Sequence, residues 1–194
     1  MTAWLVVGLG NPGPRYELTR HNVGARVIEL LAERLETRLR KVRFIPIEAG
    51  QARVDSEAVL LARPQTFMNV SGPPVASLAK RRKIDVEHLV ACHDEIDLAF
   101  GALKVKAGGS TAGHQGLNSL ARGLGSTEFL RVRVGVGRPP GRKDPADHVL
   151  DEFSKAERDD AAALIEDAAE AVLTLIREGL TLAQDRHNRG GPSR

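Results

Sequence analysis

Hydrophobic residues along the chain recur in two kinds of pattern. Short apolar runs, typical of buried strands, alternate with longer segments in which apolar residues return every three or four positions, as on the core face of an amphipathic helix. The first kind predicts strands at residues 4–7, 43–47, 51–55, 58–62, 88–93, 103–105 and 130–136. The second predicts helices at 22–39, at 74–82, through Leu117 and Leu120, and at 155–178.

This alternation of strands and helices predicts an α/β domain with three layers, in which helices flank both faces of a central sheet. The strands predicted within 43–62 have the close spacing of hairpins, so we expect a mixed sheet rather than a purely parallel one. The chain has 194 residues, of which 42% are hydrophobic, and no internal repeat. We therefore expect a single domain over 1–186, followed by a flexible polar tail over 187–194.

Charge is unevenly distributed along the chain. Residues 144–170 contain ten acidic and two basic residues, a net charge of −8. The rest of the chain contains 26 basic and 15 acidic residues, a net charge of +11. Such asymmetry fits either an anionic partner, with nucleic acid the leading candidate, or two solvated faces of opposite sign.

Cysteine usage and hydropathy indicate the compartment. Cys92 is the only cysteine, which excludes an intramolecular disulfide and is typical of a reducing environment. The N-terminal apolar run is too short for a signal peptide, and no stretch is long enough to span a bilayer. We therefore expect a cytoplasmic protein with no membrane partner.

The first strand is followed by a motif that suggests nucleotide binding. Residues 8–13 (GLGNPG) match the pattern G-x-G-x-x-G of dinucleotide-binding proteins. In such proteins the helix begins within the motif, whereas here Pro12 and Pro14 flank Gly13 and helical periodicity starts only after Arg20. A ribose-binding acidic residue at the end of a second strand is also missing. A dinucleotide-binding oxidoreductase is therefore disfavoured, and we expect no cofactor.

Familiar catalytic patterns are also missing. The chain has no G-x-S-x-G motif and no Cys/His set with zinc spacing, so neither a serine hydrolase nor a metal site is expected. Cys92 and His93 are neighbours on a predicted strand and point to opposite faces, which disfavours a thiol nucleophile. What remains is a set of polar residues at strand ends and in loops: Asn11, His21, Asn22, Asn69, Asp94, His114 and Gln115. Taken singly, each could be only a cap or turn residue.

Several blocks of sequence together resemble the bacterial peptidyl-tRNA hydrolases. The blocks are 8–13 (GLGNPG) with Tyr16 and 19–24 (TRHNVG), 64–72 (PQTFMNVSG), 93–97 (HDEID), 113–117 (GHQGL) and 131–139 (RVRVGVGRP). They occur in the order of the family and the resemblance covers the chain from residue 5 to about residue 185. It implies that 1–186 is a catalytic domain with the fold of this family, and that the protein recycles tRNA from prematurely released peptides.

The resemblance also implies catalytic roles. His21 is the expected general base, and Asp94 is expected to keep its imidazole oriented and basic. Asn69 is expected to donate its amide to the ester as oxyanion charge develops. Asn11 is expected to distinguish peptidyl from free aminoacyl substrates.

Substrate-binding residues follow from the same resemblance. Tyr16 and Phe67 are expected to contact the 3′ end of the tRNA, since bases and ribose pack well on aromatic rings. Lys106 and Arg133 match positions that grip tRNA phosphates, and residues 138–145 and those following are expected to form the base and lid of a peptide groove. The remaining expected substrate-binding residues are Met68, His114 and Gln115. The implied partner is peptidyl-tRNA, bound by a monomer.

Two positions depart from the family pattern. Gln115 stands where the family usually has Asn, and Ala112 stands where it has the first of two glycines. Gln keeps the amide donor and acceptor but adds one methylene, so the substrate contact there is expected to be displaced. This departure leaves open a second class of function, a relative that binds RNA without hydrolysing it.

Overall fold

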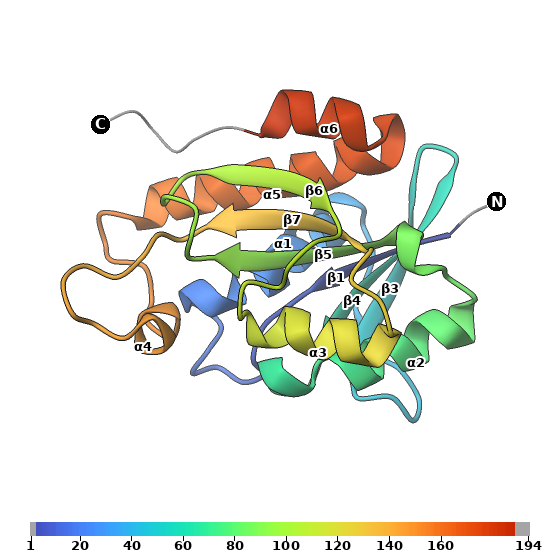
Figure 1. Cartoon of the computed structure of the whole chain (residues 1–194). Helices are drawn as coiled ribbons and strands as arrows, with labels where there is room; N and C mark the ends of the chain where they lie inside the picture. Colours follow the sequence, from blue (N-terminus) through green and yellow to red (C-terminus); the bar gives the residue numbers. More distant parts are fainter. Residues whose placement is uncertain (1–2, 189–194) are drawn as a thin grey trace.

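A computed structural model describes residues 3–188. Its middle layer is a seven-stranded sheet in the order β2-β3-β4-β1-β5-β7-β6 (Figure 1). The strands are β1 (Ala3–Gly8), β2 (Arg40–Lys41), β3 (Ile47–Val54), β4 (Glu57–Pro64), β5 (Leu89–Glu95), β6 (Leu103–Ala107) and β7 (Leu130–Gly135). The four central strands β4, β1, β5 and β7 run parallel, while β2, β3 and β6 pair antiparallel to their neighbours. The predicted mixed sheet is confirmed.

Helices cover both faces of this sheet (Figure 1). They are α1 (Val23–Arg34), α2 (Gly72–Arg82), α3 (Gln115–Leu124), the short α4 (Pro145–Val149), α5 (Arg158–Glu178) and α6 (Leu180–His187), with single 3₁₀ turns η1 (Arg20–Asn22), η2 (Met68–Val70) and η3 (Val86–His88). Alternate residues of one strand face opposite layers, so Val6 of β1 packs in the core under α1 and α5, and Leu5 packs in the core under α2 and α3. The predicted three-layer arrangement is confirmed.

The strand predicted at 43–47 is wrong. The chain turns between β2 and β3, with Phe44 in the left-handed conformation (φ +64°) and the Ile45 amide donating to the carbonyl oxygen of Val42. The apolar run resembles a strand, but Ile45 is buried while Phe44 is 82% exposed. The first helix is also shorter than predicted, because the chain enters the left-handed region at Glu36 (φ +49°) just after α1 ends.

The C-terminal part contains a helix that the pattern did not predict. His187 is the last residue of α6, and the side chain of Asn188 hydrogen-bonds both the amide and the carbonyl oxygen of Val105 on the edge strand β6. The described structure therefore extends two residues past the predicted domain end, and residues 189–194 of the predicted tail lie outside it. Within the described residues, every helix is too short or too polar to cross a membrane.

Candidate active site

The predicted site residues converge where the parallel strands end. A cavity of about 480 Å³ opens beside the carboxyl ends of β1 and β5, the usual place for a site in an α/β sheet. Eight of the eleven predicted site residues line it: Asn11, His21, Phe67, Met68, Asn69, Asp94, His114 and Gln115. Pro145, Ala146 and Val149 of α4 line it as well. The three predicted site residues outside this lining are Tyr16, Lys106 and Arg133.

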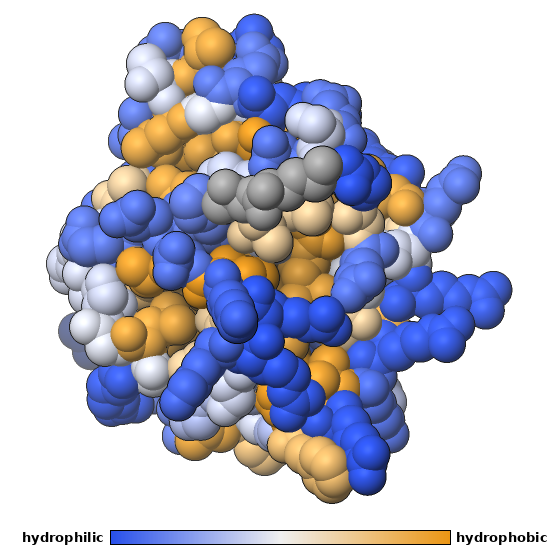
Figure 2. All heavy atoms as spheres, turned by 90° about the vertical axis from the view of Figure 1, so that its right-hand side faces the viewer, coloured by the Kyte–Doolittle hydropathy of each residue, from blue (hydrophilic) through white to orange (hydrophobic). Residues whose placement is uncertain are grey.

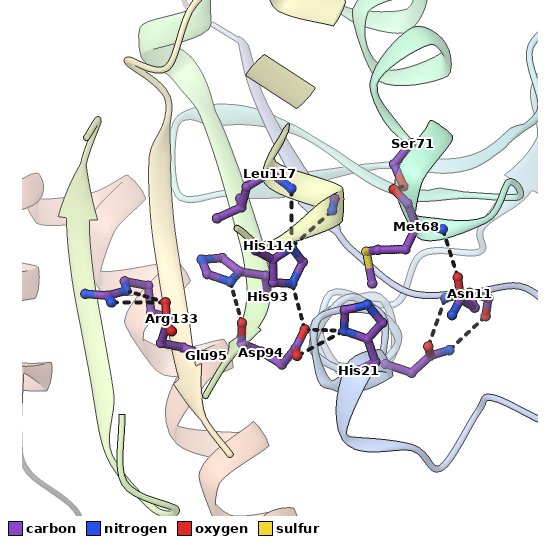
Figure 3. A network of polar contacts seen from close by, with 12 residues as sticks. Asn11, His21, Met68, Ser71, His93, Asp94, Glu95, His114, Leu117 and Arg133 are labelled. Atoms are coloured by element: carbon purple, nitrogen blue, oxygen red, sulfur yellow. Dashed lines mark hydrogen bonds and ion pairs between the residues drawn. The ribbon is translucent and has the colours of Figure 1, made fainter. Parts of the chain in front are cut away.

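Asp94 and His21, which both line the cavity, form a hydrogen-bonded pair (Figure 3). The Nδ1 atom of His21 lies 2.9 and 3.0 Å from the two carboxylate oxygens of Asp94. A carboxylate only accepts hydrogen bonds, so Nδ1 carries the proton and Nε2 keeps its lone pair. The side chain of Asp94 is 2% exposed and that of His21 is 12% exposed. The pair is thus sheltered, with one basic ring nitrogen left for a ligand in the cavity.

His114 makes a second hydrogen bond to the same carboxylate. Its Nε2 atom lies 2.8 Å from Oδ1 of Asp94. Its Nδ1 atom accepts from the backbone amides of Gly116 and Leu117, which caps the N-terminus of α3 (Figure 3). These two contacts fix a neutral ring with the proton on Nε2. His114 therefore orients Asp94 and ties it to α3.

His21, Asp94 and His114 could in principle hold a metal ion, since their ligand atoms lie within 4.8 Å of one another. The hydrogen bonds argue for a different role. Nδ1 of His114 already accepts from two backbone amides, so a metal at its Nε2 would require the loss of the proton from a neutral imidazole. The three residues fit a hydrogen-bonded network better than a metal site.

Electrostatics keep the carboxylate charged. Burial acts to raise the pKa of Asp94, but the electrostatic attraction of His21 and His114 and their hydrogen bonds to the carboxylate outweigh it and hold this pKa well below its usual range. Burial acts to lower the pKa of His21, but the charge of Asp94 and its hydrogen bond prevail and raise this pKa above 6.5. Asp94 therefore makes His21 a stronger base than a free imidazole.

Cys92 and His93 lie on opposite faces of β5, as predicted. Cys92 is buried in the core under α1 and α5, and burial raises the pKa of its thiol to about 12, which fits a packing role. His93 donates from Nδ1 to the carbonyl oxygen of Asp94 at 2.6 Å, and its ring meets that of His114 edge-on at 4.9 Å. Burial and the nearby His114 lower the pKa of His93 to about 3, so this ring is neutral.

Among the described residues, the side-chain amide nitrogen of Asn11 has no hydrogen-bond partner. Its Oδ1 accepts from the backbone amide of Met68 at 2.8 Å, which fixes the orientation of the side chain, because an N–H donor must meet the oxygen. The side chain of Asn22 holds the backbone of Asn11, because it accepts from the amide of Asn11 and donates to its carbonyl oxygen. The Nδ2 group of Asn11 is thus available to a ligand in the cavity.

Close packing explains the glycines around this loop. A Cβ atom on Gly8 would lie 2.3 Å from the carbonyl oxygen of Gly24, and one on Gly24 would lie 2.1 Å from that of Cys92. The motif at 8–13 therefore lets α1 approach β1 and β5 closely. No helix begins within it, because α1 starts at Val23. The structure supports the argument against a dinucleotide site.

Asn69 and two aromatic rings lie at the rim of the cavity. Asn69 is exposed on η2, whose position is set by the Asn11–Met68 hydrogen bond. Phe67 is 55% exposed, and its ring packs edge-on against that of Tyr16 with centroids 6.2 Å apart. Tyr16 lies outside the cavity lining but touches a residue that belongs to it.

Lys106 and Arg133 lie on β6 and β7, outside the cavity. Val105 and Val132 point into the core under α5. Their neighbours in the chain, Lys106, Arg131 and Arg133, therefore project from the other face of the sheet, which α3 covers. Arg133 is bound to Glu95 at 3.0 Å. Burial and the charges of Arg133 and Arg131 lower the pKa of Lys106, as expected in a cluster of like charges.

Comparison with known proteins identifies the family. A model of the family described as peptidyl-tRNA hydrolase matches residues 5–193. The chain is 50% identical to a peptidyl-tRNA hydrolase of Kineococcus radiotolerans over 190 residues, covering 95% of this chain and 96% of the relative. It is also 50% identical to one of Mycobacteroides abscessus over 184 residues, covering 95% and 94%. The crystal structure of peptidyl-tRNA hydrolase from Acinetobacter baumannii superposes with a TM-score of 0.91 at 31% identity, covering 98% of this chain and 97% of that one. The chain belongs to the peptidyl-tRNA hydrolase family. It is an enzyme of this class.

The structure adds a residue that the sequence did not single out, Arg20, which directly precedes His21 in the chain. Arg20 is 6% exposed and forms an ion pair with Glu157 at 2.7 Å. It also donates to the carbonyl oxygen of Glu152 and stacks over Phe153 at 4.8 Å. Arg20 thus joins the turn that carries His21 to the segment after α4. The only sequence signal was its place inside the block 19–24.

A second buried arginine, Arg131, shapes the loop between β6 and α3. It donates to the carbonyl oxygens of Gly109 and Ser110, both at 2.7 Å, and so anchors one end of the segment 108–113. At the other end Ala112 has φ +49°, a left-handed conformation that glycine adopts more readily. Gln115 follows at the start of α3, exposed and lining the cavity.

Proposed function

We propose that this hydrolase cleaves the ester bond between a peptide, or an N-blocked aminoacyl group, and the 3′-terminal ribose of tRNA, with water activated by His21. The observation that carries the proposal is the Asp94–His21 hydrogen bond, which leaves Nε2 of His21 as a base in a cavity shared with Asn11 and Asn69. Release of the N-acetylamino acid from N-acetylaminoacyl-tRNA by the purified protein tests it.

The reaction needs one proton carrier. Nε2 of His21 takes a proton from water as the water oxygen attacks the ester carbonyl, and the imidazolium formed is stabilised by Asp94. The amide of Asn69 donates to the carbonyl oxygen as its negative charge develops. Collapse of the tetrahedral intermediate expels the ribose 3′ oxygen, which receives the proton from His21. The products are the peptide acid and the free tRNA, so the reaction uses only water and side chains.

Substrate selection follows from the free amide of Asn11. A peptidyl or N-acyl substrate carries a carbonyl oxygen next to its blocked amine, whereas a free aminoacyl group carries a charged ammonium there. The Nδ2–H of Asn11 donates to the carbonyl oxygen and offers nothing to an ammonium, because an amide nitrogen is only a donor. Asn11 therefore favours the blocked substrate.

The surroundings of the cavity suggest where each half of the substrate binds. The tRNA 3′ end stacks on Phe67 and Tyr16, while α4 and the segment that Arg20 anchors form the wall of the peptide groove. Met68, which is buried, supports the cavity lining from the core, and Gln115 reaches the substrate from α3. A monomeric enzyme in the cytoplasm remains our prediction from the sequence, and gel filtration and cell fractionation test it.

The two alternative functions predict different behaviour. A non-hydrolytic RNA-binding relative would bind tRNA and leave the ester intact, although the complete hydrogen-bonded network from His21 to His114 speaks against it. A dinucleotide-binding oxidoreductase would be thermally stabilised by a nicotinamide cofactor and not by tRNA.

Binding of tRNA is expected to weaken steeply as salt rises, because Lys106 and Arg133 release counterions from phosphates. Replacing both by Gln should lower the magnitude of the slope of log K against log salt by about 2, one for each lost contact. Filter binding of uncharged tRNA across a salt series measures the slope. The same variant should raise KM more than it lowers kcat. A slope equal to that of the wild type would remove both residues from the tRNA site.

Gln115 is expected to be a working substitute for the usual Asn. Gln115→Asn should change kcat/KM by less than about tenfold in either direction, the scale of one repositioned neutral hydrogen bond. Gln115→Ala should cost more, because a substrate group then loses its partner. Single-turnover hydrolysis by the three proteins measures this. Equal rates for Gln115→Ala and the wild type would exclude Gln115 from the site.

A further inference from the structure

A basic groove lies far from the ester-cleaving cavity. Its volume is about 750 Å³, and it is bounded by the segment 36–43, by β3 and by the C-terminal end of α2. Six cationic side chains line it: Arg38, Arg40, Lys41, Arg43, Arg81 and Arg82. Figure 2 views the side of the molecule where α2 ends and shows strongly hydrophilic side chains projecting from its lower part. We call this hollow the β2–α2 groove.

The charge of the β2–α2 groove is largely uncompensated. Glu36 is the one acidic residue in its lining. Within the described part of the chain, none of the six cations has a carboxylate within ion-pair distance. Arginines elsewhere, such as Arg20 and Arg133, do form ion pairs. Lys80 and Lys83 add charge at the end of α2. A concentration of unpaired cations in a hollow attracts an anionic partner.

The groove is distinct from the surface of Lys106 and Arg133. That surface is proposed to hold phosphates of the acceptor arm, the arm of the tRNA that carries the ester. The groove lies at the β2 edge of the sheet, whereas Lys106 lies on β6 at the other edge. Six strand spacings separate those edges, roughly 29 Å. Along the other direction, the groove lies at the far end of α2, whose 11 residues span about 16 Å from the cavity end at Gly72. An RNA arm placed on Lys106 therefore leaves the groove free.

Its residue types favour nucleic acid over an acidic protein. Five of the six cations are arginines, whose planar guanidinium groups bind phosphate oxygens through paired hydrogen bonds. Phe44, 82% exposed, stands beside them with the guanidinium of Arg43 above its ring at 4.5 Å. This cation–π contact helps to hold the Arg43 guanidinium in place beside the groove, where it can meet a phosphate.

We propose that the β2–α2 groove is a second RNA-binding surface, which holds the phosphate backbone of a duplex RNA other than the acceptor arm being cleaved. The separation of the two RNA contacts rests on the proposed role of Lys106 and Arg133. The groove would let the hydrolase stay attached to a larger RNA while its cavity processes substrate.

The test uses the full chain and a blunt 20-base-pair RNA duplex without a 3′ overhang or an acyl group, with binding followed by fluorescence anisotropy. The groove variant carries Arg38→Gln, Arg40→Gln, Arg43→Gln and Arg82→Gln. A matched control carries Lys at the same four positions and so keeps the charge. A second control carries Lys106→Gln and Arg133→Gln. Hydrolysis of N-acetylaminoacyl-tRNA is measured in parallel for the groove variant.

The groove variant should bind the duplex at least tenfold more weakly than the wild type, with the magnitude of its salt slope reduced by about 3 to 4. The Lys control and the second control should lose less than threefold, and hydrolysis by the groove variant should be unchanged. Unaltered duplex binding by the groove variant overturns the proposal, as does loss of duplex binding in the second control. Equal, groove-dependent binding of poly-glutamate would show a general anion surface instead and would also overturn it. Failure of hydrolysis in the wild type would refute the proposed function without touching this result.

Discussion

His21→Ala is expected to lower kcat for peptidyl-tRNA hydrolysis by about 10²–10⁴-fold, the usual contribution of a positioned general base. The Kd for tRNA should change little, because the base acts in the transition state while phosphate contacts supply ground-state affinity. Single-turnover hydrolysis with enzyme in excess, together with filter binding, separates the two quantities.

His88→Ala is the matched control for this substitution. His88 lies in η3 at the opposite end of β5, with its ring edge-on to that of Trp4 at 5.1 Å, and does not line the cavity. Its replacement can alter stability but should leave kcat as in the wild type. Wild-type turnover in His21→Ala would contradict the assignment of the base.

Asp94→Asn is expected to have the second-largest effect, a loss of at least about 100-fold in kcat. The carboxylate accepts from Nδ1 of His21 and from Nε2 of His114, so both rings depend on it. An amide offers a single acceptor oxygen and turns an N–H group toward one of these donors. The productive tautomer of His21 is no longer enforced, and the imidazolium loses its counter-charge.

The pH profile gives this substitution a signature that simple misfolding would not produce. His21 must be unprotonated to act as a base, so kcat/KM of the wild type should fall at low pH with an apparent pKa above 6.5, since Asp94 raises the pKa of His21. Without that charge, burial is left to lower the pKa. The acid limb of Asp94→Asn should therefore move to lower pH.

Asp97→Asn serves as the control for Asp94→Asn, because Asp97 is an exposed carboxylate, paired with Arg138, that does not line the cavity. Both its rate and its acid limb should match the wild type. An unshifted acid limb in Asp94→Asn would show that Asp94 does not set the basicity of His21.

Hydrophobic periodicity predicted the layers of the fold but not its short elements. Strands such as β1 and β7 alternate or run apolar because both faces of the sheet are covered, which leaves a strong pattern. Helix α6 has no such pattern: Leu182 is 43% exposed, and the helix is held by packing on β6 and by Asn188 rather than by a continuous apolar face. The strand predicted at 43–47 was wrong for the opposite reason, because this segment is a turn that is rich in apolar residues.

The site could be assembled from the sequence only through the family resemblance. His21 and Asp94 are 73 positions apart, and no local pattern predicts that their side chains meet. Arg20 and Arg131 show a further limit, because an arginine in a sequence resembles a surface residue. Arg20 is buried because residues far along the chain fold against it: Glu157, 137 positions away, together with Glu152 and Phe153.

The central claim is that this member of the family hydrolyses the ester and does not merely bind the RNA. A single-turnover reaction with purified protein in excess over N-acetylaminoacyl-tRNA tests it directly, with binding of the same tRNA confirmed in the same sample. The account predicts complete release of the N-acetylamino acid by the wild type and almost none by His21→Ala at equal occupancy. Bound tRNA whose ester stays intact in the wild type would contradict it.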